Sequence, residues 1–501
     1  AAAAESGAPC EAIRARASVA LAGGYRARPR APAAPHLASK LLREAGATVE
    51  TTLDADVQAY AMRALRDHLS DLAARNVEDG AIVVLDNATG EVLAYVGSSG
   101  ELSRAPEVDG VVARRQAGST LKPFIYARAL DDRLLTAASL VDDSPLAIAT
   151  ARGVYAPQNY DRDFQGSVSV RTALAGSLNV PAVRTAELVG IARVHEDLRA
   201  LGFDTLTEDA DHYGAALALG GADVTLLALA NAYRALANGG TWSPARIRRE
   251  DAPGAAAPRR VVGAQAAFIV SDILADRGAR AGTFGLDNPL ATRVWSAAKT
   301  GTSKDMRDNW CVGYTARYTI GVWVGNFSGA PMHDVSGIAG AAPVFRDLVH
   351  FLHRDTPSPA PRAPKDLVAE TVAFVPAVEP PRREWFVRGT AMASVRATGR
   401  EHDDPAAALP RIRYPAPDTL IALDPDIPEG HQRVAFVASP ATAAVRWRLD
   451  DTLLDAHGAR VLWTPVAGRH RLVLEDAAGA VLANVAFEVR GGRALVQAAS
   501  H

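Results

Sequence analysis

A run of prolines divides the chain into two parts that differ in the periodicity of their apolar residues. The run DTPSPAPRAP spans Asp355 to Pro364, and proline-rich segments favour semi-rigid, extended linkers. Before it, helical patterns alternate with apolar runs, and after it the apolar residues come in short alternating runs separated by Gly, Pro and Asp. A chain of 501 residues with such a break is expected to fold into two or three domains.

The part before the linker has strand signals at both of its ends. Apolar runs from Gly80 to Leu85 and from Glu91 to Val96 flank the turn residues Asn87 to Gly90, and they predict a β-hairpin. Later apolar runs predict three more strands, at Val294 to Ala298, Trp310 to Tyr314 and Tyr318 to Val324. With helical patterns between these groups, residues 48–354 are expected to form an α/β (α+β) domain with a five-stranded, largely antiparallel sheet flanked by helices.

The helical patterns include the most apolar stretch of the chain, Tyr213 to Tyr233. Gly220, Gly221 and Asp223 interrupt it, so it predicts a loop followed by a buried helix capped by Asp223, and not a membrane span. The other predicted helices cover Asp54 to Ala74, Val170 to Leu174, Pro181 to Ala200 and Gln265 to Ala275, and one more begins at Ser119 in the stretch QAGSTLKPFIY.

The remaining segments lack long periodic patterns. Residues 1–47 are rich in Ala, Arg and Pro and are interpreted as a connector. Residues 355–405 are expected to be the linker and a short connecting segment with a weak strand signal at Glu384 to Val387. Residues 406–501 are predicted to form a small, Ig-like β-sandwich from short alternating runs such as Val445 to Leu449, Arg460 to Trp463 and His470 to Leu474.

Chemistry is first indicated by the stretch Gln116 to Tyr126, which places Ser119 and Lys122 three residues apart at the start of a helical pattern. This spacing brings the hydroxyl and the amine to one face. A serine is a weak nucleophile unless a nearby base removes its proton, and a lysine of lowered pKa can be that base. Gly118 leaves room in front of the serine, and Pro123 falls in the first turn, where a missing N–H costs little. The stretch therefore predicts a nucleophile and its base at a helix start.

Two further motifs stand later in the chain, Ser177-Leu-Asn179 and Lys299-Thr300-Gly301. Chance would give about 0.5 matches to S-x-N and about 0.02 to K-T-G in a chain of this composition. The distribution of lysine supports a chemical role for the motifs, because only five of the 54 Lys and Arg residues are lysine and two of these five stand in the motifs. Lysine differs from arginine in being able to lose its proton and in being a compact charge. The three motifs therefore indicate one catalytic site.

Composition excludes several other classes of protein. The formal net charge is −2 and the arginines are spread along the chain, so nothing indicates nucleic-acid binding. Cys10 and Cys311 are too few for a disulfide framework or a metal cluster. His470 is expected to be a surface or core histidine rather than a metal ligand. No cofactor and no metal ion are predicted.

In their order, the three motifs are those of the penicillin-recognising serine enzymes, and the chain resembles the class A penicillin-binding proteins. The resemblance covers the transpeptidase part strongly, over about residues 48–350, and the C-terminal part more weakly. It implies the five-stranded fold predicted above. A class A protein carries a glycosyltransferase domain and a membrane anchor upstream, so we interpret residues 1–47 as the remnant of that region. The full-length protein is expected to be periplasmic and anchored in the inner membrane.

Residue types and the resemblance together suggest a role for each motif residue. Ser119 would attack the carbonyl of a peptidoglycan stem peptide ending in D-Ala-D-Ala, Lys122 would take its proton, and Ser177 would relay that proton to the departing amine. Asn179 would hold the amide carbonyl of the substrate. The substrate carboxylate would be bound by Lys299 with Thr300 and Thr302. The resemblance implies an oxyanion hole made of the backbone N–H groups of Ser119 and Thr302. Gly301 would let the substrate approach the strand closely.

Three functions remain open on the sequence alone. The first is a D,D-transpeptidase that cross-links peptidoglycan and is acylated by β-lactams. The second is a D,D-carboxypeptidase or β-lactamase-like hydrolase, which shares the acylation step, although no Glu-x-x-Leu-Asn element that could activate water stands between the second and third motifs. The third is a non-catalytic scaffold whose C-terminal domain binds other cell-wall proteins. The complete motif set favours an active enzyme.

Overall fold

The structure is a computed structural model that describes residues 33–150, 153–159, 164–251, 257–397, 410–415, 419–423, 432–439 and 445–490. Most of the connector expected over residues 1–47, including Cys10, lies outside the described residues, as does part of the segment expected to connect to the sandwich. None of the helices in the described part of the chain is long and apolar enough to cross a membrane.

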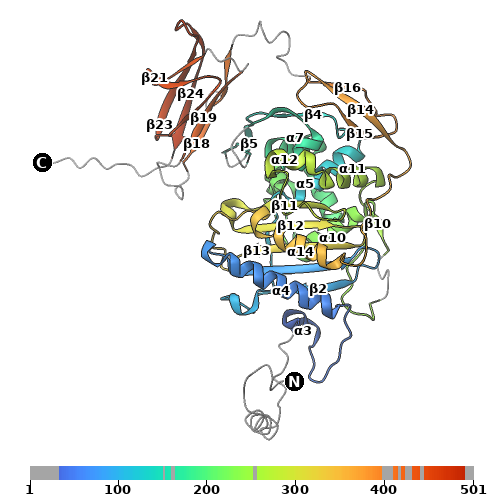
Figure 1. Cartoon of the computed structure of the whole chain (residues 1–501). Coiled ribbons are helices and arrows are strands. Elements are labelled where there is room, and N and C mark those ends of the chain that lie inside the picture. Colours follow the sequence, from blue (N-terminus) through green and yellow to red (C-terminus); the bar gives the residue numbers. More distant parts are fainter. Residues whose placement is uncertain are drawn as a thin grey trace, which may run out of the picture.

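A five-stranded antiparallel sheet is the centre of the fold, which confirms the predicted fold class (Figure 1). The strand order is β11-β12-β13-β1-β2. The hairpin of β1 and β2 therefore joins the three later strands through the pairing of β1 with β13, and β11 lies at one edge of the sheet. The bounds are β1 Asp79–Asp86, β2 Val92–Val96, β11 Ala297–Thr302, β12 Asp308–Tyr314 and β13 Tyr318–Gly325.

Both faces of this sheet are covered, which is why β1 is a continuous apolar run. Along β1, Ala81, Val83 and Leu85 belong to the apolar core on one face, whereas Ile82 and Val84 belong to the core on the other. Because side chains alternate along a strand, two separate cores need apolar residues at every position. The second core is closed by α4 (Ala55–Asp71), α13 (Gly337–Gly340) and α14 (Ala342–Leu352).

The first core lies under a helical lobe inserted between β2 and β11 (Figure 1). Its main elements are η3 (Gly118–Leu121), α5 (Lys122–Asp131), α6 (Val170–Ala175), α7 (Asn179–Val189), α8 (Ile191–Ala200), η4 (Gly214–Leu219), α10 (Leu226–Ala237), α11 (Ala264–Ala275) and α12 (Arg277–Phe284). The shorter helices of the part of the chain up to α14 are α3 (Pro35–Leu41), η1 (Ala73–Arg75), η2 (Gly100–Leu102), α9 (Ala210–Tyr213) and η5 (Lys304–Met306). Four pairs of short strands also occur there: β3 (Arg115–Gln116) with β8 (Asp223–Val224), β4 (Leu140–Asp143) with β7 (Gly166–Ser169), β5 (Ile148–Thr150) with β6 (Gly153–Tyr155), and β9 (Thr241–Trp242) with β10 (Arg259–Arg260).

Several predicted boundaries need correction. The helix expected over Pro181 to Ala200 is broken at Gly190, which adopts φ +91°. The cap of α10 is Thr225, whose hydroxyl accepts from the N–H of Ala228, whereas Asp223 belongs to β8. Ser119 lies in the 3₁₀ turn η3, and α5 begins only at Lys122.

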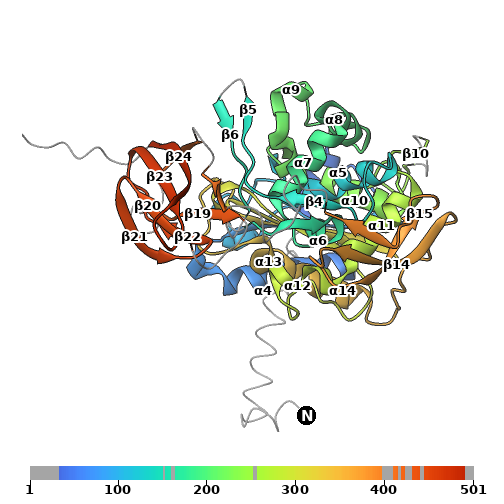
Figure 2. The same cartoon turned by 90° about the horizontal axis from the view of Figure 1, so that it is seen from above.

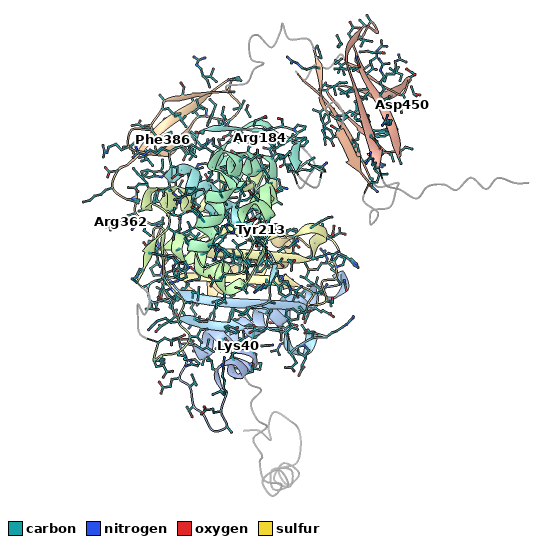
Figure 3. All side chains as sticks on the ribbon, turned by 180° about the vertical axis from the view of Figure 1, so that it is seen from behind. Lys40, Arg184, Tyr213, Arg362, Phe386 and Asp450 are labelled. Atoms are coloured by element: carbon teal, nitrogen blue, oxygen red, sulfur yellow. The ribbon has the colours of Figure 1, made fainter. Side chains whose placement is uncertain are left out.

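The expectation of a linker and short connecting segment over residues 355–405 also needs correction. Residues 367–396 form a three-stranded sheet, ordered β15-β14-β16, with the bounds β14 Leu367–Val375, β15 Arg382–Val387 and β16 Ser394–Arg396. Phe386, Val372 and Phe374 pack in one apolar cluster with Ala138 of the helical lobe. The small sheet lies beside α11 in two views and at the end of the lobe opposite Lys40 (Figures 1, 2 and 3). It is thus packed against the helical lobe.

The C-terminal residues form the predicted β-sandwich. Its two sheets are β17-β19-β22 and β18-β24-β23-β20-β21, and Phe436, Trp447 and Phe487 fill the space between them. The bounds are β17 Arg411–Tyr414, β18 Thr419–Ala422, β19 Val434–Ser439, β20 Arg446–Leu449, β21 Thr452–His457, β22 Arg460–Trp463, β23 Gly468–Glu475 and β24 Val481–Arg490. His470 bonds Asp450 and packs against Trp463 and Phe487.

Candidate active site

The three sequence motifs meet at one cavity of about 520 Å³ beside the edge strand β11. Ser119 reaches it from η3, Ser177 and Asn179 from the junction of α6 and α7, and Thr300, Gly301 and Thr302 from β11. The cavity is lined by Gln116, Gly118, Ser119, Gly176, Ser177, Asn179, Ala216, Leu219, Gly220, Gly221, Thr283, Phe284, Thr300, Gly301, Thr302, Ser303, Lys304, Ser336, Gly337 and Ile338. Lys122 and Lys299 are buried behind this lining.

Close backbone packing holds the turn of Ser119 against β11. Gly118 has φ +54°, and a Cβ there would lie 2.7 Å from the carbonyl oxygen of Thr302. A Cβ on Gly220 would lie 2.1 Å from the carbonyl oxygen of Gly118, and one on Gly301 would lie 2.7 Å from Cγ2 of Thr120. These glycines therefore let η3, η4 and β11 approach one another. The sequence suggests that Gly118 and Gly301 make room for a substrate. The structure adds this close packing as a second reason for glycine at both positions.

Lys122 is fully buried and is held by three carbonyl oxygens. Its Nζ donates to Ser177 O at 2.7 Å, to Leu178 O at 3.1 Å and to Asn179 Oδ1 at 2.6 Å. Within the described residues, Ser119 and Lys122 share no side-chain hydrogen bond, so the structure does not show the expected contact between nucleophile and base. Burial, together with the charge of Lys299, lowers the pKa of Lys122 well below its usual value, although Asp143 opposes the shift.

Ser177 connects the two motif lysines. Its carbonyl oxygen accepts from Lys122, and its hydroxyl accepts from Nζ of Lys299 at 2.7 Å. Its backbone adopts φ +60°, which is uncommon for a residue with a side chain. This conformation directs the hydroxyl of Ser177 to one lysine and its carbonyl to the other.

The side chain of Asn179 is engaged at both ends. Its Oδ1 accepts from Lys122, and its Nδ2 donates to Gln158 O at 2.6 Å. Its backbone N–H donates to Oδ1 of Asn159, whose own amide group donates to the buried carboxylate of Asp143. A primary amide has two N–H groups. The second N–H of Asn179 is therefore the one available to a substrate carbonyl.

Lys299 also lies in an environment that disfavours its charge. Only 3% of it is exposed, and its Nζ donates to Ser177 and to the carbonyl of Thr300 at 2.9 Å. Burial, with a contribution from the nearby Arg280, lowers the pKa of Lys299 to about 7. At the end of β11, the hydroxyl of Thr302 accepts from the N–H of Gly337 at 3.0 Å.

The sequence motifs missed several residues that line the cavity. Thr283 and Phe284 come from the end of α12, and Ser336, Gly337 and Ile338 come from the start of α13. None of these belongs to a recognised motif. In the sequence, Gly220 and Gly221 appear only as an interruption of an apolar stretch. In the structure both line the cavity, and Gly220 packs tightly against Gly118.

Comparisons with known proteins agree with this geometry. The family profile described as "Penicillin binding protein transpeptidase domain" matches residues 80–350, and that of the "Penicillin-Binding Protein C-terminus Family" matches residues 399–487. Penicillin-binding protein 1C of Escherichia coli is 35% identical over 306 residues, covering 61% of this chain and 38% of that protein. Penicillin-binding protein 1B of Vibrio cholerae is 31% identical over 329 residues, covering 63% and 41%. The chain thus spans about two fifths of the length of these curated relatives.

Solved structures show the same fold. The crystal structure of penicillin-binding protein 1A from Haemophilus influenzae superposes with a TM-score of 0.59 at 20% identity, covering 71% of this chain and 75% of that one. The penicillin-binding protein PonA1 from Mycobacterium tuberculosis superposes with a TM-score of 0.54 at 25% identity, covering 64% and 88%. With more than half of its length matched by the family profile, the chain belongs to the penicillin-binding protein transpeptidase family.

Proposed function

We propose that the chain is a peptidoglycan D,D-transpeptidase that forms an acyl-enzyme on Ser119 from D-Ala-D-Ala stem peptides and is acylated there by β-lactams. The observation that carries the proposal is the meeting of Ser119, Ser177, Asn179 and the edge of β11 at one cavity, with two buried lysines behind it. Since this substrate lies outside the cytoplasmic membrane, we place the activity in the periplasm, in a full-length protein anchored in the inner membrane.

The proposed first step is attack of Ser119 Oγ on the carbonyl carbon between the two D-Ala residues. Three carbonyl oxygens surround Nζ of Lys122, which is one more than a neutral amine can donate to. To accept the proton of Ser119, Lys122 must be neutral and must give up one of these three hydrogen bonds, so that its lone pair can face the hydroxyl of Ser119. The bond to Leu178 O is the longest of the three, at 3.1 Å. The burial that lowers the pKa of Lys122 favours this neutral form.

The tetrahedral intermediate then loses D-Ala as the carbon–nitrogen bond breaks. Its oxyanion would be stabilised by the backbone N–H groups of Ser119 and Thr302. The proton held by Lys122 would pass through the hydroxyl of Ser177 to the departing amine, because a hydroxyl can accept and donate at once. Lys299 would bind the carboxylate of the leaving residue, assisted by the hydroxyls of Thr300 and Thr302, and Asn179 would hold the peptide carbonyl.

The fate of the acyl-enzyme separates a transpeptidase from a hydrolase. No Asp or Glu is among the described residues that line the cavity. Water and an acceptor amine could both use Lys122 as a base, but water would lack a carboxylate to activate it further, whereas a neutral amine is the stronger nucleophile toward the ester. This favours transfer to an amine over hydrolysis.

Incubation with a β-lactam is expected to add one intact inhibitor to the chain, on Ser119, and the adduct is expected to persist for minutes or longer. Intact mass spectrometry followed by peptide mapping measures both. Ser119→Ala is the control and should show no adduct. An unmodified wild-type chain, or an adduct lost within seconds, would contradict the proposed function.

Binding of a β-lactam carboxylate is expected to weaken as the pH rises from 6 to 9. Lys299, with a pKa of about 7 in the free protein, loses its charge over this range. A bound carboxylate favours the charged lysine, so binding takes up a proton, and the apparent dissociation constant should rise by up to about tenfold per pH unit above pH 7. The apparent dissociation constant is obtained at each pH from the β-lactam concentration at which the acylation rate reaches half of its limiting value.

The limiting acylation rate should instead rise with increasing pH, because it requires a neutral Lys122. Lys299→Arg is the matched variant for binding, since arginine keeps its charge and should remove the pH dependence of the dissociation constant. A dissociation constant that stays flat in the wild type, or that rises as the pH falls, would show that Lys299 does not bind the carboxylate as a cation.

A further inference from the structure

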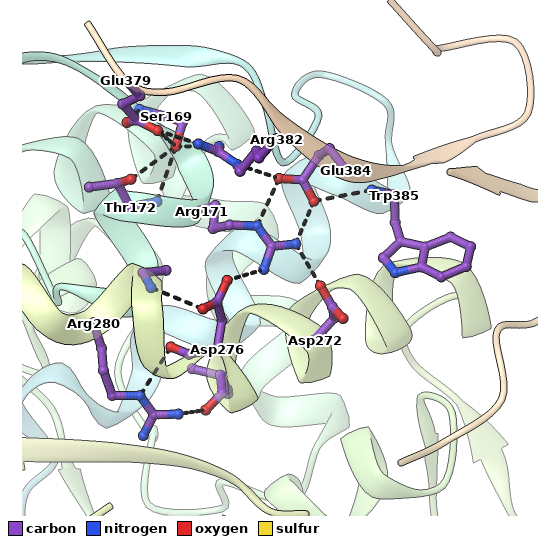
Figure 4. Close-up of polar contacts among 12 residues, drawn as sticks. Ser169, Arg171, Thr172, Asp272, Asp276, Arg280, Glu379, Arg382, Glu384 and Trp385 are labelled. Atoms are coloured by element: carbon purple, nitrogen blue, oxygen red, sulfur yellow. Dashed lines mark hydrogen bonds and ion pairs between the residues drawn. The ribbon is translucent and has the colours of Figure 1, made fainter. Parts of the chain in front are cut away.

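A buried arginine lies where α6, α11, the start of α12 and β15 meet, next to the active site. Arg171 of α6 donates through Nε to Glu384 Oε2 at 2.7 Å, and its Nη2 also contacts Oε1 of Glu384. It reaches Asp272 of α11 at 2.6 Å, and Asp276 before α12 at 3.0 Å. We call these four residues the Arg171 cluster (Figure 4).

Burial makes the members of the Arg171 cluster dependent on one another. Arg171 is 5% exposed and Glu384 is fully buried. Although burial alone would lower the pKa of Arg171, its hydrogen bonds and charge interactions with Glu384 and Asp272 raise it. Arg382 adds a second cation beside Glu384 at 3.1 Å. Charges removed from water in this way are retained only with partners of good geometry, so the positions of α6, α11, α12 and β15 are coupled.

The cluster reaches the catalytic residues through α6. This helix has six residues and ends at Ala175, with Gly176 as its C-cap directly before Ser177. A helix so short has little stability of its own and depends on tertiary contacts. At its C-terminal end, the hydroxyl of Thr283 in α12 donates to Gly176 O at 3.2 Å. The Arg171 cluster thus fixes one end of α6 and the end of α12 fixes the other.

The same contacts place α12, which forms one wall of the cavity. Asp276 bonds Arg171 through Oδ2 and caps α12 by accepting from the N–H of Ala279 at 2.9 Å through Oδ1. Arg280, one turn later, donates to the carbonyl oxygen of Asp276 at 3.3 Å (Figure 4). It also donates to Leu274 O, and its charge contributes to the lowered pKa of Lys299. Movement at Asp276 would therefore be transmitted to the end of α12, where Thr283 and Phe284 line the cavity.

We propose that Arg171 and Glu384 are positioning residues for acylation, a role that rests on the proposed function of Ser119, Lys122 and Ser177. They hold α6 and α12 so that the backbone of Ser177, at φ +60°, keeps its hydroxyl on Lys299 and its carbonyl on Lys122. Glu384 belongs to β15, so the three-stranded sheet beyond the proline-rich segment is part of the catalytic unit. Misplacement of a catalytic group by about 1 Å can cost on the order of 100-fold in rate.

The test uses Glu384→Gln and Arg171→Lys in the full chain, with the limiting acylation rate and the apparent dissociation constant of a fluorescent penicillin measured separately. Glu384→Gln keeps the size of the side chain and leaves Arg171 with two carboxylates, so the variant has partners for its buried charge. Arg171→Lys keeps the charge, but an ammonium group cannot span Glu384 and Asp276 as the planar guanidinium group does.

Asp197→Asn is the control for loss of one carboxylate from a buried arginine, because its partner Arg128 stands near the end of α5 remote from Lys122 and neither residue lines the cavity. Arg128 bonds Asp197 through two hydrogen bonds, at 2.5 and 3.0 Å, and also contacts Asp131 and Asp132. Both Arg128 and Asp197 are buried. Loss of the Asp197 charge should lower the melting temperature, as loss of the Glu384 charge should, but without moving Ser177.

We expect Glu384→Gln to lower the limiting acylation rate about tenfold or more while the dissociation constant changes less than about threefold, and Arg171→Lys to have a smaller effect of the same kind. Asp197→Asn should retain the wild-type rate. Wild-type rates in folded Glu384→Gln, or an equal loss of rate in Asp197→Asn, would overturn the inference. If Glu384→Gln does not fold, a wild-type rate in Arg171→Lys would overturn it. Absence of acylation in the wild type would instead refute the proposed function.

Discussion

Lys122→Arg is expected to lower the second-order rate constant of β-lactam acylation on the order of 10² to 10⁴-fold, as for loss of a general base. Arginine stays protonated at all relevant pH values and cannot accept the proton of Ser119. The structure adds a second reason, because Lys122 is completely buried among the carbonyls of Ser177 and Leu178 and the side chain of Asn179, and a guanidinium group is larger than the space an ammonium group fills.

Lys299→Arg is expected to be much milder, because its proposed task is to face a carboxylate, which arginine also does well. Some loss should follow from its bulk, since Lys299 is buried and bonds Ser177. The measurement is the acylation rate of each purified variant with one β-lactam, after circular dichroism has shown that it is folded. Equal losses, or a greater loss for Lys299→Arg, would refute the two roles.

Truncation after Lys365 is expected to abolish acylation, whereas truncation after Ala397 should leave the rate within about threefold of the full chain, as for removal of an independent domain. The sequence alone predicts that everything from residue 365 onward can be removed. The structure moves this boundary, because the shorter chain loses the apolar contacts of Phe386 and Phe374 with the lobe and leaves Arg171 without Glu384. Breaking a buried ion pair costs about 3–5 kcal/mol, which is a large share of a total stability of about 5–15 kcal/mol.

Labelling with a fluorescent penicillin, combined with thermal unfolding, distinguishes the two chains. The longer chain should unfold in one transition with its labelling intact. Full labelling of the chain that ends at Lys365 would show that the small sheet is dispensable. Loss of folding in the chain that ends at Ala397 would show that the transpeptidase unit needs the sandwich.

The central sheet and the candidate site residues can be predicted from the sequence because both are encoded locally. The run Gly80 to Leu85 is apolar at nearly every position and could only be a buried strand or helix, and the following turn residues decide for a hairpin. The motifs around Ser119, Ser177 and Lys299 each combine a reactive side chain with a residue that shapes the backbone. Such combinations can be recognised without knowledge of their neighbours in space.

The remaining features depend on contacts between distant residues. Nothing near Arg171 in the sequence indicates that its partner is Glu384, and the alternating pattern of β15 gives only a weak strand signal. Phe284 and Gly337 line the cavity because α12 and α13 pack where they do. The hydrogen bonds of Lys122 to carbonyls, rather than to Ser119, likewise follow from the path of the backbone between α6 and α7.

The position of β11 at the edge of the central sheet has a consequence for self-association. An open edge strand offers unpaired backbone groups to any other chain and is a common site of aggregation. Here η3 lies against one face of β11 and the start of α13 against the other, so closely that a Cβ on Gly118 or on Gly337 would come within 2.7 Å of the β11 backbone. Thr300, Gly301 and Thr302 of this edge line the cavity of about 520 Å³, which is small compared with the sheet of a second folded copy. The packing that recesses this end of β11 in the cavity thus disfavours pairing with the edge strand of a second molecule.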